Sequence, residues 1–68
     1  MMNSFGENLR YYRTLAKLSQ AKLGEKLGFS ARTVSDWECN NTEPNLDTLN
    51  ELVKILNISY EELLDYKK

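Results

Sequence analysis

The stretch SQAKLGEKLGFSARTVSDWE, residues 19–38, decides the fold of this chain. Ser19 and Ser30 each have the position of a helix cap, because a serine hydroxyl accepts a hydrogen bond from an amide of the first helical turn. Gly28 lies between them and ends the first segment, since glycine adopts the left-handed backbone conformation without a side-chain clash. The stretch therefore predicts two short helices joined by a tight turn, over residues 20–27 and 31 to about 39.

Five residues in this stretch have the spacing of a DNA-binding helix-turn-helix, predicted over about 19–38. Two helices that cross steeply need a small residue where their backbones approach, and a residue that tolerates a positive φ at the turn. They also need apolar anchors after the turn and along the buried side of the second helix. The residues that meet these needs are Gly24, Gly28, Phe29, Val34 and Trp37.

The segments on either side carry helix signals of their own. The pairs Ser4–Glu7 and Ser59–Glu62 fit the capping box, while Pro44 and Asn45 introduce a segment that ends at Asn57. Apolar residues recur at helical spacing in a first helix to about Lys17 and in the fourth helix: Phe5, Leu9, Tyr12 and Ala16, then Leu49, Leu52, Val53 and Leu56. No run alternates with a period of two. The chain is predicted to be all-α, a compact bundle of five short helices.

Length and composition restrict the function. The 68 residues make one domain, 1–68, with one thin core and no room for a deep cavity. There is no histidine, and Cys39 is the single cysteine. The usual general base, the zinc ligand sets and the catalytic Ser-His and Cys-His pairs are therefore missing. We expect no enzyme, no cofactor and no metal site. Without a signal peptide or an apolar span, we expect a cytoplasmic protein.

The net charge of −1 hides an uneven distribution of charges along the chain. Residues 1–32 carry six basic side chains and two acidic ones, whereas residues 33–68 carry three basic and eight acidic. Such an asymmetry is typical of a protein with one side that faces a polyanion. The alternative is that these charges only solvate helix faces.

The stretch at residues 19–38, with LRYYR before it and EPNLDTLNELVKILNISYEELL after it, resembles the lambda-repressor and Cro-like domain. That domain is also called the xenobiotic-response-element family of transcriptional regulators. The resemblance extends from Phe5 to Leu64. It implies a five-helix DNA-binding domain with a central helix-turn-helix, and a function as a regulator, most often a repressor, that reads a palindromic operator in double-stranded DNA.

The third helix has one side suited to the major groove. With about 100° between successive residues, its exposed arc contains Ala31, Arg32, Ser35 and Asp36, and the opposite arc, which should meet the core, contains Val34, Trp37 and Glu38. The exposed side chains are short or polar, so the arc fits a groove about 12 Å wide.

Each side chain on the exposed arc has a functional and a simpler interpretation. Arg32 can bridge guanine O6 and N7, or contact only phosphate or solvent. Asp36 can accept from a cytosine or adenine amine, or pair within the helix. Ala31 can touch a thymine methyl or simply favour the helix, and the hydroxyls of Thr33 and Ser35 can reach DNA or solvent.

The resemblance implies further roles. Gln20 matches a family glutamine that binds a phosphate and braces the recognition helix, and Arg13 and Glu38 match a structural ion pair between the first and third helices. The family loop after the third helix usually carries glycine and basic residues, whereas Asn40 and Asn41 stand here. Asn40 can still take the left-handed conformation. The residues predicted to contact DNA are Ser19, Gln20, Ser30, Ala31, Arg32, Thr33, Ser35, Asp36, Asn40 and Asn41.

Two questions about partners stay open at this stage. The last helix offers Ile58, Tyr60, Leu64 and Tyr66, which can form a homodimer interface or only close the core. The acidic second half and the non-basic loop also suit another function. In that alternative the chain is a protein-interaction module, such as an antitoxin-like or anti-repressor subunit, that kept the fold without strong DNA binding.

Overall fold

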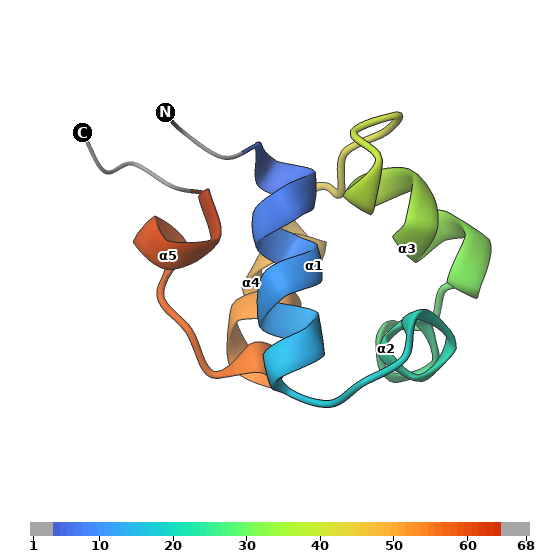
Figure 1. The fold of residues 1–68 in the computed structure, drawn as a ribbon, viewed down its shortest axis with the longest axis horizontal. Helices are drawn as coiled ribbons and strands as arrows, with labels where there is room; N and C mark the ends of the chain where they lie inside the picture. The colour runs from blue at the N-terminus through green and yellow to red at the C-terminus, as the bar shows by residue number, and fades with distance from the viewer. Residues whose placement is uncertain (1–3, 65–68) are drawn as a thin grey trace.

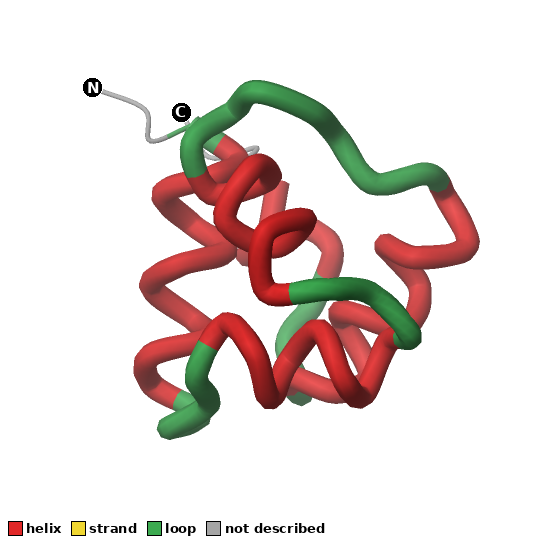
Figure 2. The backbone as a smooth tube through the Cα atoms, turned by 90° about the vertical axis from the view of Figure 1, so that its right-hand side faces the viewer, coloured by secondary structure: helices red, strands yellow, loops and turns green. Residues whose placement is uncertain are grey.

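Five helices make up the computed structural model, which describes residues 4–64 (Figure 1). In chain order they are α1 (Phe5–Leu15), α2 (Gln20–Leu27), α3 (Ala31–Glu38), α4 (Leu46–Leu56) and α5 (Tyr60–Leu64). Loops join these helices, and residues 4–64 contain no strand (Figure 2). The prediction of an all-α chain with five short helices is confirmed.

The caps that the sequence predicts are formed. Ser4 and Glu7 make the reciprocal hydrogen bonds of a capping box, and Ser59 and Glu62 do the same ahead of α5. The side chains of Ser19, Ser30 and Asn45 each accept a hydrogen bond from the amide three residues on, at the starts of α2, α3 and α4. These caps satisfy amides that the helices themselves cannot pair, and so fix where each helix begins.

The first helix ends earlier than the sequence indicates. It stops at Leu15 rather than near Lys17, and Ala16, expected on its apolar face, is an exposed C-cap. Lys17 takes a left-handed conformation with φ of 62°, and the Leu18 amide donates back to the Arg13 carbonyl at 3.2 Å. The positive φ of Lys17 and this hydrogen bond turn the chain toward α2 without a glycine. The sequence contains no signal for it, because lysine rarely adopts a positive φ.

The hydrophobic core lies where the five helices meet. α1 and α4 stand in the middle, with α5 on one side and the α2–α3 pair on the other (Figure 1). The fully or nearly fully buried apolar side chains are Leu9, Leu23, Val34, Trp37, Leu52, Leu56 and Leu63. Every helix contributes at least one of them, so no helix can leave its place without exposing part of the same core.

A buried amide joins the first and last helices. Asn8 is 5 % exposed, and its Nδ2 donates to the carbonyl oxygen of Leu63 at 3.1 Å. The donor and acceptor come from positions 55 residues apart in the chain. Because an unpaired buried amide is costly, this bond holds the short α5 in one position against α1.

Glu38 anchors the end of α3 to two other helices. Its carboxylate accepts from Arg13 Nε and Nη2 on α1 and from Gln20 Nε2 on α2, the last at 2.9 Å. The remaining guanidinium nitrogen, Nη1, donates to the Leu18 carbonyl at 2.7 Å. The side chains of Arg13 and Glu38 are only 13 % and 4 % exposed. We call Arg13, Gln20 and Glu38 the Glu38 cluster.

The ion pair of the Glu38 cluster is therefore largely buried, and each of the three guanidinium nitrogens donates a hydrogen bond, which makes the loss of one partner expensive. We expect Arg13→Ala to lower the free energy of unfolding by about 2–4 kcal/mol, because Glu38 is left as an uncompensated buried charge. The matched control is Arg10→Ala on the exposed side of the same helix, which should change stability by no more than about 0.5 kcal/mol. Chemical denaturation of both variants measures the difference. Equal midpoints for the two would contradict a stabilising role for the pair.

Candidate nucleic-acid interface

The turn between α2 and α3 depends on two glycines for different reasons. A Cβ on Gly24 would lie 2.6 Å from the carbonyl oxygen of Phe29, so there is no room for a larger residue where the helices approach. Gly28 has space around it but a φ of +85°, which side chains other than glycine rarely accept. The two glycines set the steep approach of α3 to α2.

The three apolar anchors expected after the turn differ in burial. Val34 and Trp37 are buried, as predicted. Phe29 is 42 % exposed, so the expectation of a buried anchor has to be corrected for this residue. Its ring packs edge-on against Trp37, with 5.3 Å between ring centroids, and covers the indole from outside. It lies at the rim of the core because the turn carries it past the end of α2.

The arc of α3 that the helical spacing predicts to be exposed is fully exposed only at Arg32, whose side chain is 85 % exposed. Ala31, Ser35 and Asp36 are half-buried, which corrects the expectation for these three residues. Val34, Trp37 and the side chain of Glu38 are buried on the opposite arc, as predicted. We call Ala31, Arg32, Ser35 and Asp36 the α3 face.

The starts of α2 and α3 are arranged in the same way. Ser19 Oγ accepts from the Lys22 amide at 2.9 Å, and Ser30 Oγ accepts from the Thr33 amide at 3.2 Å. Ser30 Oγ also shares a hydrogen bond with Thr33 Oγ1 at 3.1 Å. Helix N-termini carry partial positive charge and attract anions. These two starts therefore suit phosphate groups, but their serine hydroxyls already serve as caps.

Gln20 has a partner that the sequence did not predict. Its Nε2 donates one hydrogen bond to Glu38, inside the Glu38 cluster, and leaves a second N–H on the same nitrogen. The side chain is thus tied to the carboxylate that anchors α3. A family glutamine that braces the recognition helix was expected here, and the geometry gives the bracing partner.

Asn40 and Asn41, in the loop after α3, form hydrogen bonds within the protein. Asn40 has a left-handed conformation with φ of 62°, as expected. Its side chain, however, bridges the start of α1: Oδ1 accepts from the Gly6 amide and Nδ2 donates to Ser4 Oγ, each at 3.0 Å. The Asn41 amide donates to the Asp36 carbonyl at 2.9 Å, and its side chain is exposed. Asn40 therefore holds this loop against α1, whereas the Asn41 side chain faces solvent.

The start of α1 and the end of α3 are in direct backbone contact. A Cβ on Gly6 would press on the Glu38 carbonyl and lie 2.8 Å from the Trp37 carbonyl oxygen. Sequence reasoning missed this contact, as it missed the buried bond of Asn8 and the bridge of Asn40. A weak signal was present only for Gly6, because glycine has a low helix propensity and its place in the first turn of a helix calls for a packing reason.

Exposed cations lie on α1, on the turn after it, on α2 and on α3. Arg10, Lys17, Lys22 and Arg32 are all exposed. Lys22 pairs with Glu25 at 3.2 Å, but both side chains are more than half exposed, so solvent and salt screen the pair. These four cations remain available for long-range attraction of a polyanion. Cys39 is a free, exposed cysteine at the C-cap of α3.

Two further features are absent from residues 4–64. That part of the chain has no group of three or more carboxylate, thiol or imidazole side chains able to hold a metal ion. None of its helices is both long enough and apolar enough to cross a membrane.

Comparison with known proteins gives consistent results. A model of the helix-turn-helix family matches residues 9–63. Repressor protein C2 of Salmonella phage P22 is 42 % identical over 59 residues, which cover 87 % of this chain and 27 % of that protein. The transcriptional activator BcrR of Enterococcus faecalis is 35 % identical over 60 residues, covering 88 % and 29 %. The chain thus spans less than a third of the length of these two relatives.

A solved structure matches almost the whole fold. The P22 c2 repressor, crystallised in complex with a synthetic operator, superimposes with a TM-score of 0.86 at 38 % identity, covering 96 % of this chain and 98 % of that one. The resemblance to lambda-repressor-like domains is confirmed. With the family match over residues 9–63 and the α2–turn–α3 geometry described above, this chain belongs to the helix-turn-helix family of regulators.

Proposed function

We propose that this protein is a sequence-specific DNA-binding transcriptional regulator that acts as a repressor, with α3 in the major groove of double-stranded DNA. The α3 face carries the proposal, because it is a polar surface on a helix whose other side is locked into the core by Val34, Trp37 and Glu38. The helix-turn-helix relatives, one of which was crystallised with operator DNA, support it. We further propose that the protein acts in the cytoplasm and catalyses no reaction.

In this proposal the predicted contacts divide into two groups. Arg32 bridges a guanine, Ala31 touches a thymine methyl, and Ser35 and Asp36 face neighbouring base edges. Phosphates meet the starts of the two helices and the loop after α3, at Ser19, Gln20, Ser30, Thr33 and Asn41. We assign Asn40 to holding the loop rather than to the phosphate itself, since both ends of its amide are engaged at α1.

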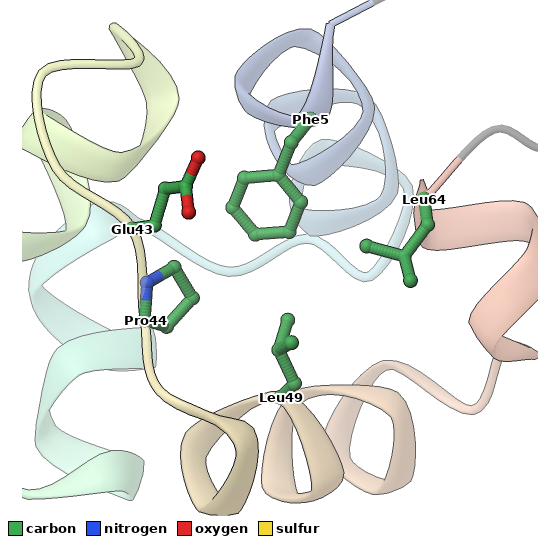
Figure 3. A pocket seen from close by; sticks show the side chains of 5 residues that line it. All are labelled: Phe5, Glu43, Pro44, Leu49 and Leu64. Atoms are coloured by element: carbon green, nitrogen blue, oxygen red, sulfur yellow. The ribbon is translucent and has the colours of Figure 1, made fainter.

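A second copy of the chain completes the proposed binding unit. Leu64 of α5 lines a hollow of about 130 Å³ together with Phe5, Glu43, Pro44 and Leu49 (Figure 3). Tyr60 is 39 % exposed, while Ile58 packs against the core, and Tyr66 lies outside the described residues. Part of the apolar surface of α5, at Tyr60 and Leu64, is thus not covered by the core. We propose a homodimer through α5, which sets two α3 helices on a palindromic operator with half-sites about 34 Å apart.

Salt dependence separates a DNA-binding regulator from a protein-interaction module. For duplex selected from random sequences, we expect the logarithm of the binding constant to fall with the logarithm of salt concentration with a slope of about −3 or steeper. This follows because Arg10, Lys17 and Lys22 each displace about one counterion on binding phosphate. Fluorescence titration at several salt concentrations gives the slope. A slope near zero would instead support the interaction module.

The α3 face and the start of α2 should carry the binding energy. We expect Arg32→Ala to weaken binding to the selected duplex at least about tenfold, since it loses a bidentate guanine contact. Gln20→Ala should weaken binding to every duplex by a similar factor, because it removes a phosphate donor. The matched control is Lys54→Ala, an exposed cation on α4, which should bind like the original protein. Equal losses for Lys54→Ala and Arg32→Ala would contradict the assignment of α3.

Self-association tests the dimer. Sedimentation at high micromolar concentration should show a dimer, with or without operator, and Tyr60→Glu should shift the equilibrium to monomer by placing a charge in the apolar interface. Lys54→Glu, on α4, serves as the charge control and should sediment like the original protein. Monomer alone under both conditions would rule out the α5 interface.

A further inference from the structure

An acidic side chain lies on the very face that is proposed to meet a polyanion. Asp36 Oδ1 is 3.7 Å from Arg32 Nε, one helical turn back along α3. The Asp36 side chain is 31 % exposed, compared with 85 % for Arg32, so the guanidinium is far more accessible than the carboxylate beside it. Any duplex that Arg32 reaches must also come close to this carboxylate.

The stability of α3 does not explain this acid. Asp36 lies in the last turn of α3, where the helix dipole presents partial negative charge, so a carboxylate there is unfavourable. Its ion pair with Arg32 is exposed on one side and therefore screened by solvent. The acid also follows its base in the helix, which is the weaker order for such a pair. A function outside the folding of α3 is the better reason for a carboxylate at this position.

The geometry of the pair leaves a defined part of the guanidinium for recognition. Arginine has five N–H donors in a planar fork. The closest approach of the pair is between Nε and Oδ1, so the two terminal nitrogens can bridge O6 and N7 of guanine, the contact proposed for Arg32. When DNA covers the pair and excludes water, the attraction between the carboxylate and Nε strengthens and limits how far the guanidinium can swing toward phosphates.

The same carboxylate also repels most of its surroundings in a duplex. It has only acceptors, so it opposes phosphate oxygens and the acceptor edges of guanine and thymine. The groups in the major groove that compensate it are the amines of cytosine N4 and adenine N6. A DNA sequence without such an amine therefore places the unpaired charge of Asp36 against acceptors. This repulsion weakens binding to that sequence, in addition to the lost contact.

We propose that Asp36 is a specificity-determining residue that acts by restraining Arg32 and by rejecting duplexes without an amine donor beside the guanine. The inference rests on the proposed function and adds to it the residue that limits which DNA is accepted. In this proposal Asp36 lowers the affinity for DNA of any sequence and increases the difference in affinity between accepted and rejected sequences.

Asp36→Asn tests the proposal, because asparagine keeps the shape and removes the charge. We expect binding to an unrelated duplex to strengthen about threefold or more, while the ratio of affinities for selected and unrelated duplex falls about tenfold, the size of one base-pair mismatch. Asp36→Ala should give the same direction of change. Selection from random duplex with each variant should show a weaker preference for guanine at the position that Arg32→Ala also loses.

Glu25→Gln is the matched control, since it removes one negative charge and an exposed ion pair on α2 without touching α3. It should strengthen binding to both duplexes alike and leave their ratio unchanged. An unchanged ratio in Asp36→Asn, or the same fall in Glu25→Gln, would overturn the assignment of Asp36. If the original protein itself does not distinguish selected from unrelated duplex, the proposed function fails, and this inference fails with it.

Discussion

The orientation of α3 depends on one buried carboxylate. Glu38 receives hydrogen bonds from Arg13 on α1 and Gln20 on α2, so three helices meet at a side chain that is 4 % exposed. Ion pairs and hydrogen bonds require defined directions, whereas apolar contacts around Val34 and Trp37 tolerate sliding and rotation. The core therefore holds α3 in place, and the Glu38 cluster sets the angle at which its polar face leaves the protein.

The same cluster connects the fold to the proposed interface. Gln20 stands at the start of α2, where a phosphate is expected, and its amide is bonded to the carboxylate that anchors α3. A phosphate bound at Gln20 would thus be positioned relative to α3 through a single intervening group. Asn40 does similar work just beyond the same end of α3, where it joins the following loop to the start of α1. Side-chain hydrogen bonds thus fix the C-terminal end of α3 to α1 and α2, while Ser30 caps its start.

Charge is divided between the parts of the molecule that meet DNA in the proposal and those that support them. The cations lie largely in the first half of the chain, while most acids of the second half lie on α4, α5 and the adjoining loops. Such a division allows a chain with a net charge of −1 to attract a polyanion from one side only. Asp36 is the exception to the division. It brings negative charge onto the α3 face, where we propose that it lowers affinity and raises discrimination between duplexes.

Local signals in the sequence determined the five helices, their caps, the glycine-dependent turn and the inward and outward sides of α3, because these follow from hydrogen bonding and periodicity within a few residues. Only the tertiary structure decided how distant segments meet. Gly6 lies against the Glu38 backbone, Asn8 is bonded to Leu63, and Phe29 covers Trp37 from outside rather than filling the core. Each of these contacts joins two different elements. Its partner is chosen by how the helices pack, and spacing along the chain does not specify that choice.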